Sequence, residues 1–266
     1  PDGLRHRTGL MGLQNAIAQA HYPDSQQEWK IARRRLAFDE LLPLQLAALS
    51  RKRAWQEEDA GVALKADPQV LDAFLAALPF QLTGAQSRVL GEVLQDMDRS
   101  RPMSRLVQGD VGSGKTVVAF AALLVAAFEG YQGAFMAPTE ILAEQHFLTV
   151  RRLLTGDSTG GQEEHLASVC VGSMPRPITI GLLMGSMSRK AKEDLHQRVA
   201  EREVDILIGT HALIQQEVEI PDLAVAVVDE QQRFGVMQRA TIRGKGLRPH
   251  LLAMSATPIP RSLSLT

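Results

Sequence analysis

The stretch of sequence that decides the fold reads Gly109-Asp110-Val111-Gly112-Ser113-Gly114-Lys115-Thr116, a complete G-x-x-x-x-G-K-T pattern. A short, mostly apolar run at 105–107 precedes it, and a longer apolar run at 117–124 with helix-compatible spacing follows it. A phosphate-binding loop requires this strand–loop–helix context, whereas a glycine-rich turn that matches by chance would not be expected to have it. The stretch therefore predicts a fold that binds a nucleoside triphosphate.

Each residue type in the loop has a role in holding phosphate. Glycines let backbone N–H groups turn inward around phosphate oxygens, and the N-terminus of the following helix adds partial positive charge. We expect Lys115 to reach the β- and γ-phosphates and the hydroxyl of Thr116 to ligate Mg²⁺. The predicted cofactors are ATP and Mg²⁺.

A second element of the site is the pair Asp229-Glu230, which follows the apolar run 224–228. A strand that ends in two carboxylates places them at the carboxyl edge of a parallel sheet, where ligands bind. We expect Asp229 to hold Mg²⁺ opposite Thr116, and Glu230 to orient and deprotonate the attacking water. Such a pair is a weak signal alone, but it is a strong one after a phosphate loop and intervening strands.

Further segments indicate what kind of nucleotide-using protein this is. Gln86 lies in the run Phe80-Gln81-Leu82-Thr83-Gly84-Ala85-Gln86, and its amide can donate to and accept from the adenine edge, which favours ATP over GTP. The runs 136–146 and 208–214 each read as a strand end followed by a turn. A last run, 254–261, reads MSATPIPR.

From residue 82 onward, short apolar runs alternate with helical patterns, which predicts an α/β fold: a RecA-like P-loop domain whose parallel sheet has helices on both faces. Strands are expected at 105–107, 134–137, 178–184, 204–208, 224–228 and 251–254, and helices at 85–97, 116–128, 141–153 and 189–202. The stretch 155–177 is rich in Gly, Ser, Thr and Pro apart from an apolar island at 166–171. We interpret it as a surface insertion.

The first 79 residues read as a helical region. Helices are expected at 9–20, at 27–54 with a kink or interruption at Pro43, and at 67–78. In the second of these, a buried apolar stripe is expected at Ile31, Leu36, Phe38, Leu41, Leu42 and Leu46. The basic triplet at 33–35 is interpreted as a solvated face rather than a phosphate contact.

Composition excludes some classes of protein and leaves others open. The 266 residues have 45% hydrophobic and 22% charged residues, which is ordinary for a soluble globular protein. The net charge of −1 neither supports nor excludes a nucleic-acid partner. The single Cys170 excludes an internal disulfide and fits a reducing cytoplasm. No apolar run approaches the length of a membrane span, and the chain, which begins with Pro1, is expected to be a piece of a longer protein.

The ordered set GDVGSGKT, APTEILAEQH, IGTHALI, DEQQRFGV and SATPIPR resembles the superfamily 2 DNA helicases. Within them, it is most similar to the RecG family of branch-migration helicases, which remodel stalled replication forks. The resemblance covers 78–265, and the runs HYPDS and ARRRLAFDELLPLQLAAL resemble the linker that precedes the motor in that family. Transcription-repair coupling translocases share the style of phosphate loop and the ATPIPR run, but LTGAQ and the linker favour RecG.

The resemblance implies a helical linker at 1–79, a first RecA-like motor domain at 80–266, and a role for particular residues. Lys115, Asp229 and Glu230 would be catalytic, and Phe80 would stack on the base, although a core phenylalanine is an equal alternative. The DNA backbone would be contacted by Pro138, Thr139, Gly209, Thr210 and His211, for which a simple helix cap at Thr139 is the alternative. Ser255 and Thr257 would couple the nucleotide state to movement along DNA.

Two departures from the family pattern matter. The family usually has histidine after Asp-Glu-Gln, where this chain has Gln232, so the coupling role of that position is in doubt. The chain also stops after SATPIPR, without the second RecA-like domain that supplies arginine fingers, which contribute about 10³ to 10⁵ in rate. We expect the chain alone to bind ATP weakly, to hydrolyse it very slowly and to unwind nothing.

The partners implied by the resemblance are branched DNA, such as forks and Holliday junctions, and the second RecA-like domain of the full-length protein. A monomer that acts in the cytoplasm without a membrane is expected. A nucleotide-gated module that binds DNA without turnover is the competing hypothesis from a different class.

Overall fold

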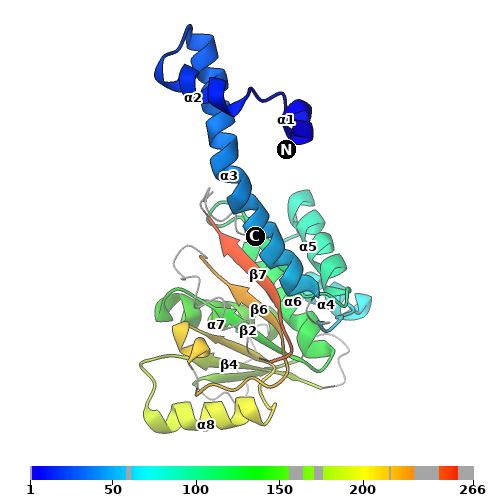
Figure 1. Cartoon of the computed structure of the whole chain (residues 1–266). Helices are drawn as coiled ribbons and strands as arrows, with labels where there is room; N and C mark the ends of the chain where they lie inside the picture. The colour runs from blue at the N-terminus through cyan, green and yellow to red at the C-terminus, as the bar shows by residue number, and fades with distance from the viewer. Residues whose placement is uncertain are drawn as a thin grey trace. The chain divides into compact units, whose positions relative to one another are not determined.

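The computed structural model describes residues 2–57, 61–155, 164–170, 176–215, 217–230 and 246–256. The chain divides into two compact units, one formed by Pro1–Glu57 with Pro260–Thr266 and the other by Glu58–Ile259 (Figure 1). The division into a linker at 1–79 and a motor at 80–266 stays a prediction.

The first unit contains three helices in its described residues: α1 (Asp2–Thr8), α2 (Leu13–His21) and α3 (Gln26–Glu57). The helix predicted at 9–20 was placed wrongly at its start, because Gly9 has φ +63 and separates α1 from α2. Glycine adopts this left-handed conformation without steric cost. Pro43 lies inside α3 without interrupting it, so the predicted interruption is wrong. The many other hydrogen bonds of a 32-residue helix offset the loss of one N–H donor.

The contact between α2 and α3 is made by small residues. Ala16 and Ala32 are both fully buried. The predicted buried stripe along α3 is wrong, since Leu41 and Leu46 are 58% and 54% exposed and the other four members are half-buried. The nine residues of α2 are too few to cover a helix of this length.

The second unit is built around a seven-stranded sheet with the order β1-β7-β6-β2-β5-β4-β3. The strands are β1 (Ser104–Gln108), β2 (Gln132–Met136), β3 (Leu166–Val169), β4 (Ile178–Leu183), β5 (Ile206–Gly209), β6 (Leu223–Val228) and β7 (His250–Ser255). All neighbouring pairs are parallel except β3 with β4. The predicted parallel α/β sheet is therefore confirmed, and all six predicted strands are present.

The strand missed from the sequence is β3, which lies within the stretch interpreted as a surface insertion. Leu166, Ala167 and Val169 are buried, and β3 pairs antiparallel with β4 at the edge of the sheet. The interpretation was wrong for this part because a four-residue strand with three apolar residues is too short a pattern to distinguish from a loop.

Helices cover both faces of the sheet. The helices of this unit are α4 (Pro68–Ala77), α5 (Gly84–Met97), α6 (Lys115–Phe128), α7 (Glu140–Thr155) and α8 (Arg189–Ala200), with a short 3-10 helix η1 (His211–Ile214). Residues of α4 to α7 form one core cluster with one face of the strands, and residues of α8 and η1 form a second cluster with the other. Alternate residues of β6 show the pleat: Val225 and Val227 belong to the first cluster, and Ala226 and Val228 to the second.

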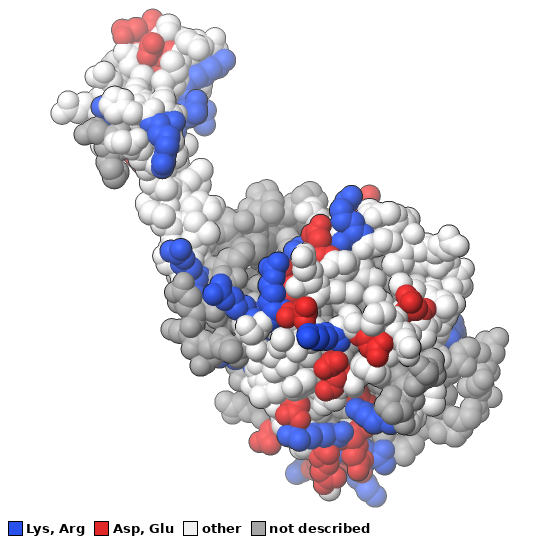
Figure 2. All heavy atoms as spheres, turned by 90° about the vertical axis from the view of Figure 1, so that its right-hand side faces the viewer, with Lys and Arg blue, Asp and Glu red and all other residues white. Residues whose placement is uncertain are grey.

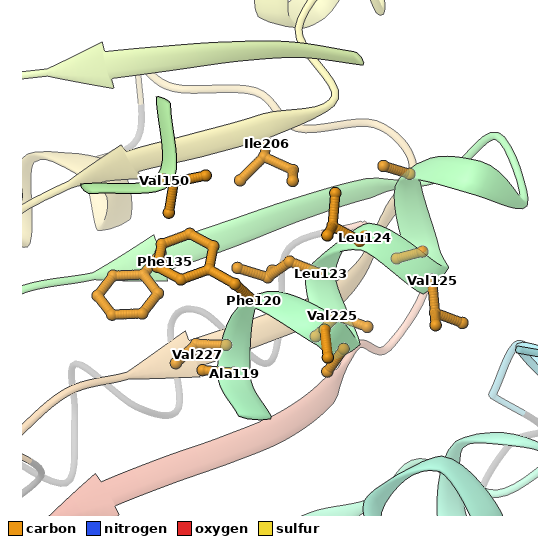
Figure 3. Packing of buried hydrophobic residues seen from close by; sticks show 14 of the residues in the cluster. Ala119, Phe120, Leu123, Leu124, Val125, Phe135, Val150, Ile206, Val225 and Val227 are labelled. Atoms are coloured by element: carbon orange, nitrogen blue, oxygen red, sulfur yellow. The ribbon is translucent and has the colours of Figure 1, made fainter. Parts of the chain in front are cut away.

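The centre of the first cluster is α6, which has every residue from 117 to 127 buried. The ring of Phe120 on this helix stacks on Phe135 of β2, with centroids 5.0 Å apart (Figure 3). A helix buried all round is what the apolar run after the phosphate loop predicts. The loop is therefore joined directly to the start of this buried helix.

A buried carboxylate, that of Asp205, pairs with the half-exposed Arg176 at the opposite end of the sheet from the predicted site. Asp205 is 4% exposed, and its carboxylate accepts from Arg176 Nη1 and Nη2 at 3.0 and 2.6 Å and from the Thr179 N–H at 2.7 Å. We expect Asp205→Ala to lower the free energy of unfolding by about 3 kcal/mol, because it leaves these donors without their acceptor. Urea unfolding measures this. Asp194→Ala, which removes an exposed pair with Arg198, is the control and should cost under about 0.5 kcal/mol.

A buried histidine makes the stability of this unit depend on pH. His250 is 0% exposed; its Nδ1 accepts from the Met103 N–H and its Nε2 donates to the Val62 carbonyl. Burial lowers the pKa of His250, so the folded state stays neutral where the unfolded chain takes up a proton. Stability should therefore be fully present above about pH 6.5 and fall by up to about 1.4 kcal/mol per pH unit below it.

Unfolding curves between pH 7.5 and 5.5 measure this dependence. His250→Asn should be less stable at every pH and should show a shallower slope below pH 6.5. An unchanged slope would contradict the assignment of that slope to His250.

Among the described residues, no helix combines the length and the apolar character that a membrane span needs. On the face of the second unit that Figure 2 shows, basic and acidic side chains are interspersed. Ion pairs of this unit include Arg105 with Asp96 and Glu92.

Candidate nucleotide-binding and nucleic-acid site

The carboxyl ends of the parallel strands bring the predicted site residues to one edge of the sheet. Three hydrogen bonds join neighbouring strand ends: the Gly109 N–H donates to Ser255 O, the Asp229 N–H to Met136 O, and the Ala137 N–H to Gly209 O. Because the strand order is β1-β7-β6-β2-β5-β4, the phosphate loop lies at one end of this edge. The acidic pair lies at the end of β6, and the predicted DNA-contacting turns follow β2 and β5.

The phosphate loop connects β1 to α6, as the sequence predicts. Gly112 and Gly114 have φ of +79 and +80, which favours glycine at both positions. A Cβ atom at Gly114 would also lie 2.2 Å from Gln86 Nε2. The backbone conformation therefore favours glycine at the end of the motif, and a larger residue there would also have to displace the Gln86 amide.

The ammonium group of Lys115 folds back on the loop. Its Nζ donates to the carbonyl oxygens of Gly109 at 2.6 Å and Asp110 at 2.8 Å. Lys115 and Thr116 are both half-buried at the start of α6. The ammonium group is thus held within the loop by carbonyl groups, which it can exchange for phosphate oxygens.

Gln86 has structural contacts that the sequence analysis missed. Its Oε1 accepts from the Thr83 N–H, while the Gln86 N–H donates to Thr83 Oγ1, which together form a capping box at the start of α5. Its Nε2 donates to Ser113 O at 2.8 Å, so the side chain also supports the phosphate loop. One hydrogen on Nε2 and one lone pair on Oε1 remain for a ligand.

Phe80 is 46% exposed, so it is not a core phenylalanine in this structure. Its side chain lines a pocket of about 530 Å³ together with residues of α4 and of the segment before α5. The other lining residues are Leu75, Ala76, Leu78, Pro79, Gln81, Leu82 and Ser87. A half-exposed aromatic ring that lines a pocket is a suitable surface for a flat base.

The acidic pair is held by its own backbone and by a histidine. Asp229 Oδ1 accepts from the Glu230 N–H at 2.9 Å, and Asp229 Oδ2 lies 3.2 Å from His146 Nε2. Glu230 has φ +48, which is uncommon for a residue with a side chain and is often found at functional sites. His146 lies in the APTEILAEQH run, but no role was predicted for it.

Ser255, predicted to couple nucleotide state to movement, ends β7 and is 2% exposed. Its carbonyl oxygen is the acceptor for the first glycine of the phosphate loop, at 3.3 Å. The structure thus brings these two predicted segments into contact. The other predicted coupling residues, Gln232 and Thr257, lie outside the described residues.

The predicted DNA-contacting residues differ in accessibility. Thr139 and His211 are exposed and Pro138 is half-buried. Thr139 Oγ1 accepts from the Leu142 N–H at 3.3 Å, so the helix-cap alternative is observed, and it leaves the hydroxyl hydrogen available. Thr210 is 2% exposed, and its Oγ1 is buried without a hydrogen-bond partner.

Gly209 has a packing reason to be glycine, because a Cβ atom there would lie 2.6 Å from Leu183 O. Gly209 and the Thr210 side chain are therefore placed inside the fold. Sequence reasoning could not separate a buried turn residue from an exposed one.

The turn after β4 was missed and lies at the same edge. Ser186 N–H donates to Glu140 Oε1 at 3.1 Å, and Lys192 Nζ donates to Gly185 O. Hydrogen bonds from Ser186 and Gly185 and the charge of Lys192 lower the pKa of Glu140. The GSMS run followed by basic residues is the signal that could have identified this turn.

A parallel sheet with a Gly-x-x-x-x-Gly-Lys-Thr loop and an acidic pair at one edge is the arrangement of the P-loop nucleotide-binding domains. The DEAD/DEAH box helicase family matches residues 83–265, and the chain belongs to this family. Where the family is named for Asp-Glu-Ala-Asp or Asp-Glu-Ala-His, the chain reads Asp-Glu-Gln-Gln.

More particularly, the chain is similar to RecG. It is 43% identical over 266 residues to the ATP-dependent DNA helicase RecG of Synechocystis and to that of Bacillus subtilis, and it covers 30% and 36% of their lengths. A solved structure of RecG bound to a three-way DNA junction matches the whole chain with a TM-score of 0.75 and 38% identity, and the chain covers 33% of it. The chain thus spans about a third of the length of the relatives it matches.

Proposed function

We propose that the chain is the ATP-binding half of the motor of a RecG-type DNA helicase, which remodels branched DNA and stalled replication forks in recombination and repair. One observation carries this proposal: the phosphate loop, Ser255, the acidic pair and the predicted DNA-contacting turns occupy successive strand ends at one sheet edge. The relatives named RecG support the choice within the family.

The residues present fit Mg²⁺. Magnesium in phosphoryl-transfer sites takes oxygen ligands, commonly one or two carboxylates together with substrate phosphates and water. Thr116 supplies a hydroxyl and Asp229 a carboxylate, so they would hold the ion. Among the described residues no group of three His, Cys, Asp or Glu gathers as a metal cluster, and a site of this kind does not need one. Bound there, Mg²⁺ would neutralise charge on the β- and γ-phosphates.

The chain's own residues would do the rest of the chemistry at the phosphates. Lys115 would exchange the carbonyls of Gly109 and Asp110 for phosphate oxygens, with backbone N–H groups of residues 109–114 around them. Glu230 would orient the attacking water and accept its proton.

The base would lie beside Phe80, with Gln86 using its remaining donor and acceptor on the adenine edge. Because Gln86 also holds Ser113 O, the same side chain would respond both to the base and to the phosphate loop. The donor and the acceptor that Gln86 offers to an adenine edge favour ATP as the ligand of the site.

The DNA backbone would contact the turns after β2 and β5. Thr139 and His211 offer exposed side chains for this contact, as suits binding without sequence readout. Gly209 and Thr210 are buried, so they would shape the turn that presents His211. Ser255, Thr257 and Gln232 would couple the nucleotide state to movement. The proposal also includes a linker at 1–79 and a motor at 80–266. It further includes a second RecA-like domain as partner, a monomeric state and a cytoplasmic location without a membrane partner.

The ATPase rate of the whole protein, with and without branched DNA, tests this function. Strong stimulation by forks, with little hydrolysis by the 266-residue chain alone, is expected. Equal stimulation by forks and by linear duplex would favour the transcription-repair coupling alternative. No stimulation by any DNA, together with retained ATP binding, would overturn the helicase in favour of a nucleotide-gated binding module.

A further inference from the structure

His146 connects the helix after β2 to the acidic pair after β6, and nothing in the proposed function uses it. It is on the second turn of α7, the helix that begins just after Thr139, and its Nε2 lies 3.2 Å from Asp229 Oδ2, 83 residues further along the chain. The two side chains are only 14% and 13% exposed. This nearly buried contact therefore joins α7, which follows a predicted DNA-contacting turn, to Asp229, the predicted metal ligand.

The direction of the hydrogen bond follows from the chemistry of the two groups. An ionised carboxylate only accepts hydrogen bonds, so Nε2 carries the hydrogen and donates it to Oδ2. Oδ1 is already held by the Glu230 N–H. Each oxygen of Asp229 thus has one donor that fixes its position and retains a lone pair for a ligand.

The imidazole ring is itself held in place. It packs on Phe135 with centroids 4.6 Å apart and an interplanar angle of 53°, and Phe135 stacks on Phe120 of α6. Three rings from α6, β2 and α7 therefore form one continuous column, whose two phenylalanines Figure 3 shows. The contact with Phe135 and the low exposure of the ring restrict the directions in which its Nε2–H group can point.

We infer that His146 is a positioning residue: its Nε2–H group holds the Asp229 carboxylate in the orientation that receives Mg²⁺, and it ties the metal site to α7. The inference rests on the proposed function, since it assumes that Asp229 binds the ion. Groups that hydrogen-bond a metal ligand orient it, and their loss typically weakens metal binding or activity 10- to 100-fold.

The test measures how much Mg²⁺ strengthens nucleotide binding. The Kd of a fluorescent, non-hydrolysable ATP analogue is determined for the 266-residue chain in Mg²⁺ and in EDTA, and the ratio of the two is the gain from the metal. His146→Leu keeps an apolar side chain against Phe135 but cannot donate, whereas His146→Gln keeps an N–H donor at a similar reach. His21→Leu, which changes an exposed histidine on α2, is the control.

We expect His146→Leu to reduce the gain from Mg²⁺ about 10-fold, with an unchanged Kd in EDTA and an unchanged melting temperature. His146→Gln should restore most of the gain. Equal gains in all variants would overturn the inference. So would an equal loss of affinity with and without Mg²⁺, which indicates a merely structural role, or a glutamine variant as weak as the leucine variant.

If the leucine variant does not fold, His146→Met replaces it as an unbranched apolar side chain. A failure of the proposed function is distinguishable from a failure of the inference. If the unaltered chain binds the analogue with no gain from Mg²⁺, the assignment of Asp229 falls and the inference falls with it. If the unaltered chain shows the gain and His146→Leu matches it, only the role of His146 is wrong.

Discussion

Replacing Lys115 with alanine should weaken ATP binding by about 100-fold or more while leaving the fold of the chain intact. The ammonium group is the cation that the loop directs at the β- and γ-phosphates, and removing a charge that is paired in a complex typically costs 2 kcal/mol or more, about 1.4 kcal/mol being tenfold in affinity. Titration with a fluorescent ATP analogue measures the loss, and circular dichroism checks the fold.

The structure supplies a matched control for this variant. Lys115 also donates to two carbonyl oxygens of its own loop, so alanine removes internal contacts as well as a phosphate ligand. Lys192 makes the same kind of contact with Gly185 O in the turn after β4. Lys192→Ala should leave ATP affinity unchanged. Unchanged affinity in Lys115→Ala would refute the assignment of residues 109–116 as the phosphate loop.

Replacing Glu230 with glutamine should leave ATP binding close to normal and reduce turnover of the whole protein by about 10² to 10⁴. Glutamine keeps the size and hydrogen-bonding capacity of the side chain but cannot accept the proton of the attacking water. The expected signature is a large fall in kcat with an almost unchanged Kd for ATP. DNA-stimulated phosphate release measures the first, and the binding titration measures the second.

Glu144→Gln is the matched control, because Glu144 is an exposed glutamate on α7 that lies outside the predicted site. It should hydrolyse ATP at the normal rate. Turnover of Glu230→Gln near that of the unaltered protein would remove Glu230 from the proposed role. Loss of ATP binding in the same variant would instead point to a structural role for this residue, which has φ +48 and donates its N–H to Asp229 Oδ1.

Much of the second unit was predictable because its signals are local. The six parallel strands and the helices between them repeat an apolar pattern over short windows, and the Gly-x-Gly-Lys-Thr part of the phosphate loop needs only neighbouring residues. Predictions failed where local patterns are ambiguous. The island at 166–171 was too short to identify as β3, and the apolar positions of α3 suggested burial without showing what would cover them.

The sequence was sufficient for the class of fold, the phosphate loop and the acidic pair, because glycine conformation, strand length and residue order along the chain specify them. Only the tertiary structure revealed that Gln86 supports Ser113 across 27 residues, that Thr210 is buried, and that His146 reaches Asp229 across 83. These contacts depend on which strands are neighbours in the sheet and on where α5 and α7 pack against it. That arrangement is set by the packing of the whole core, which no local window of sequence contains.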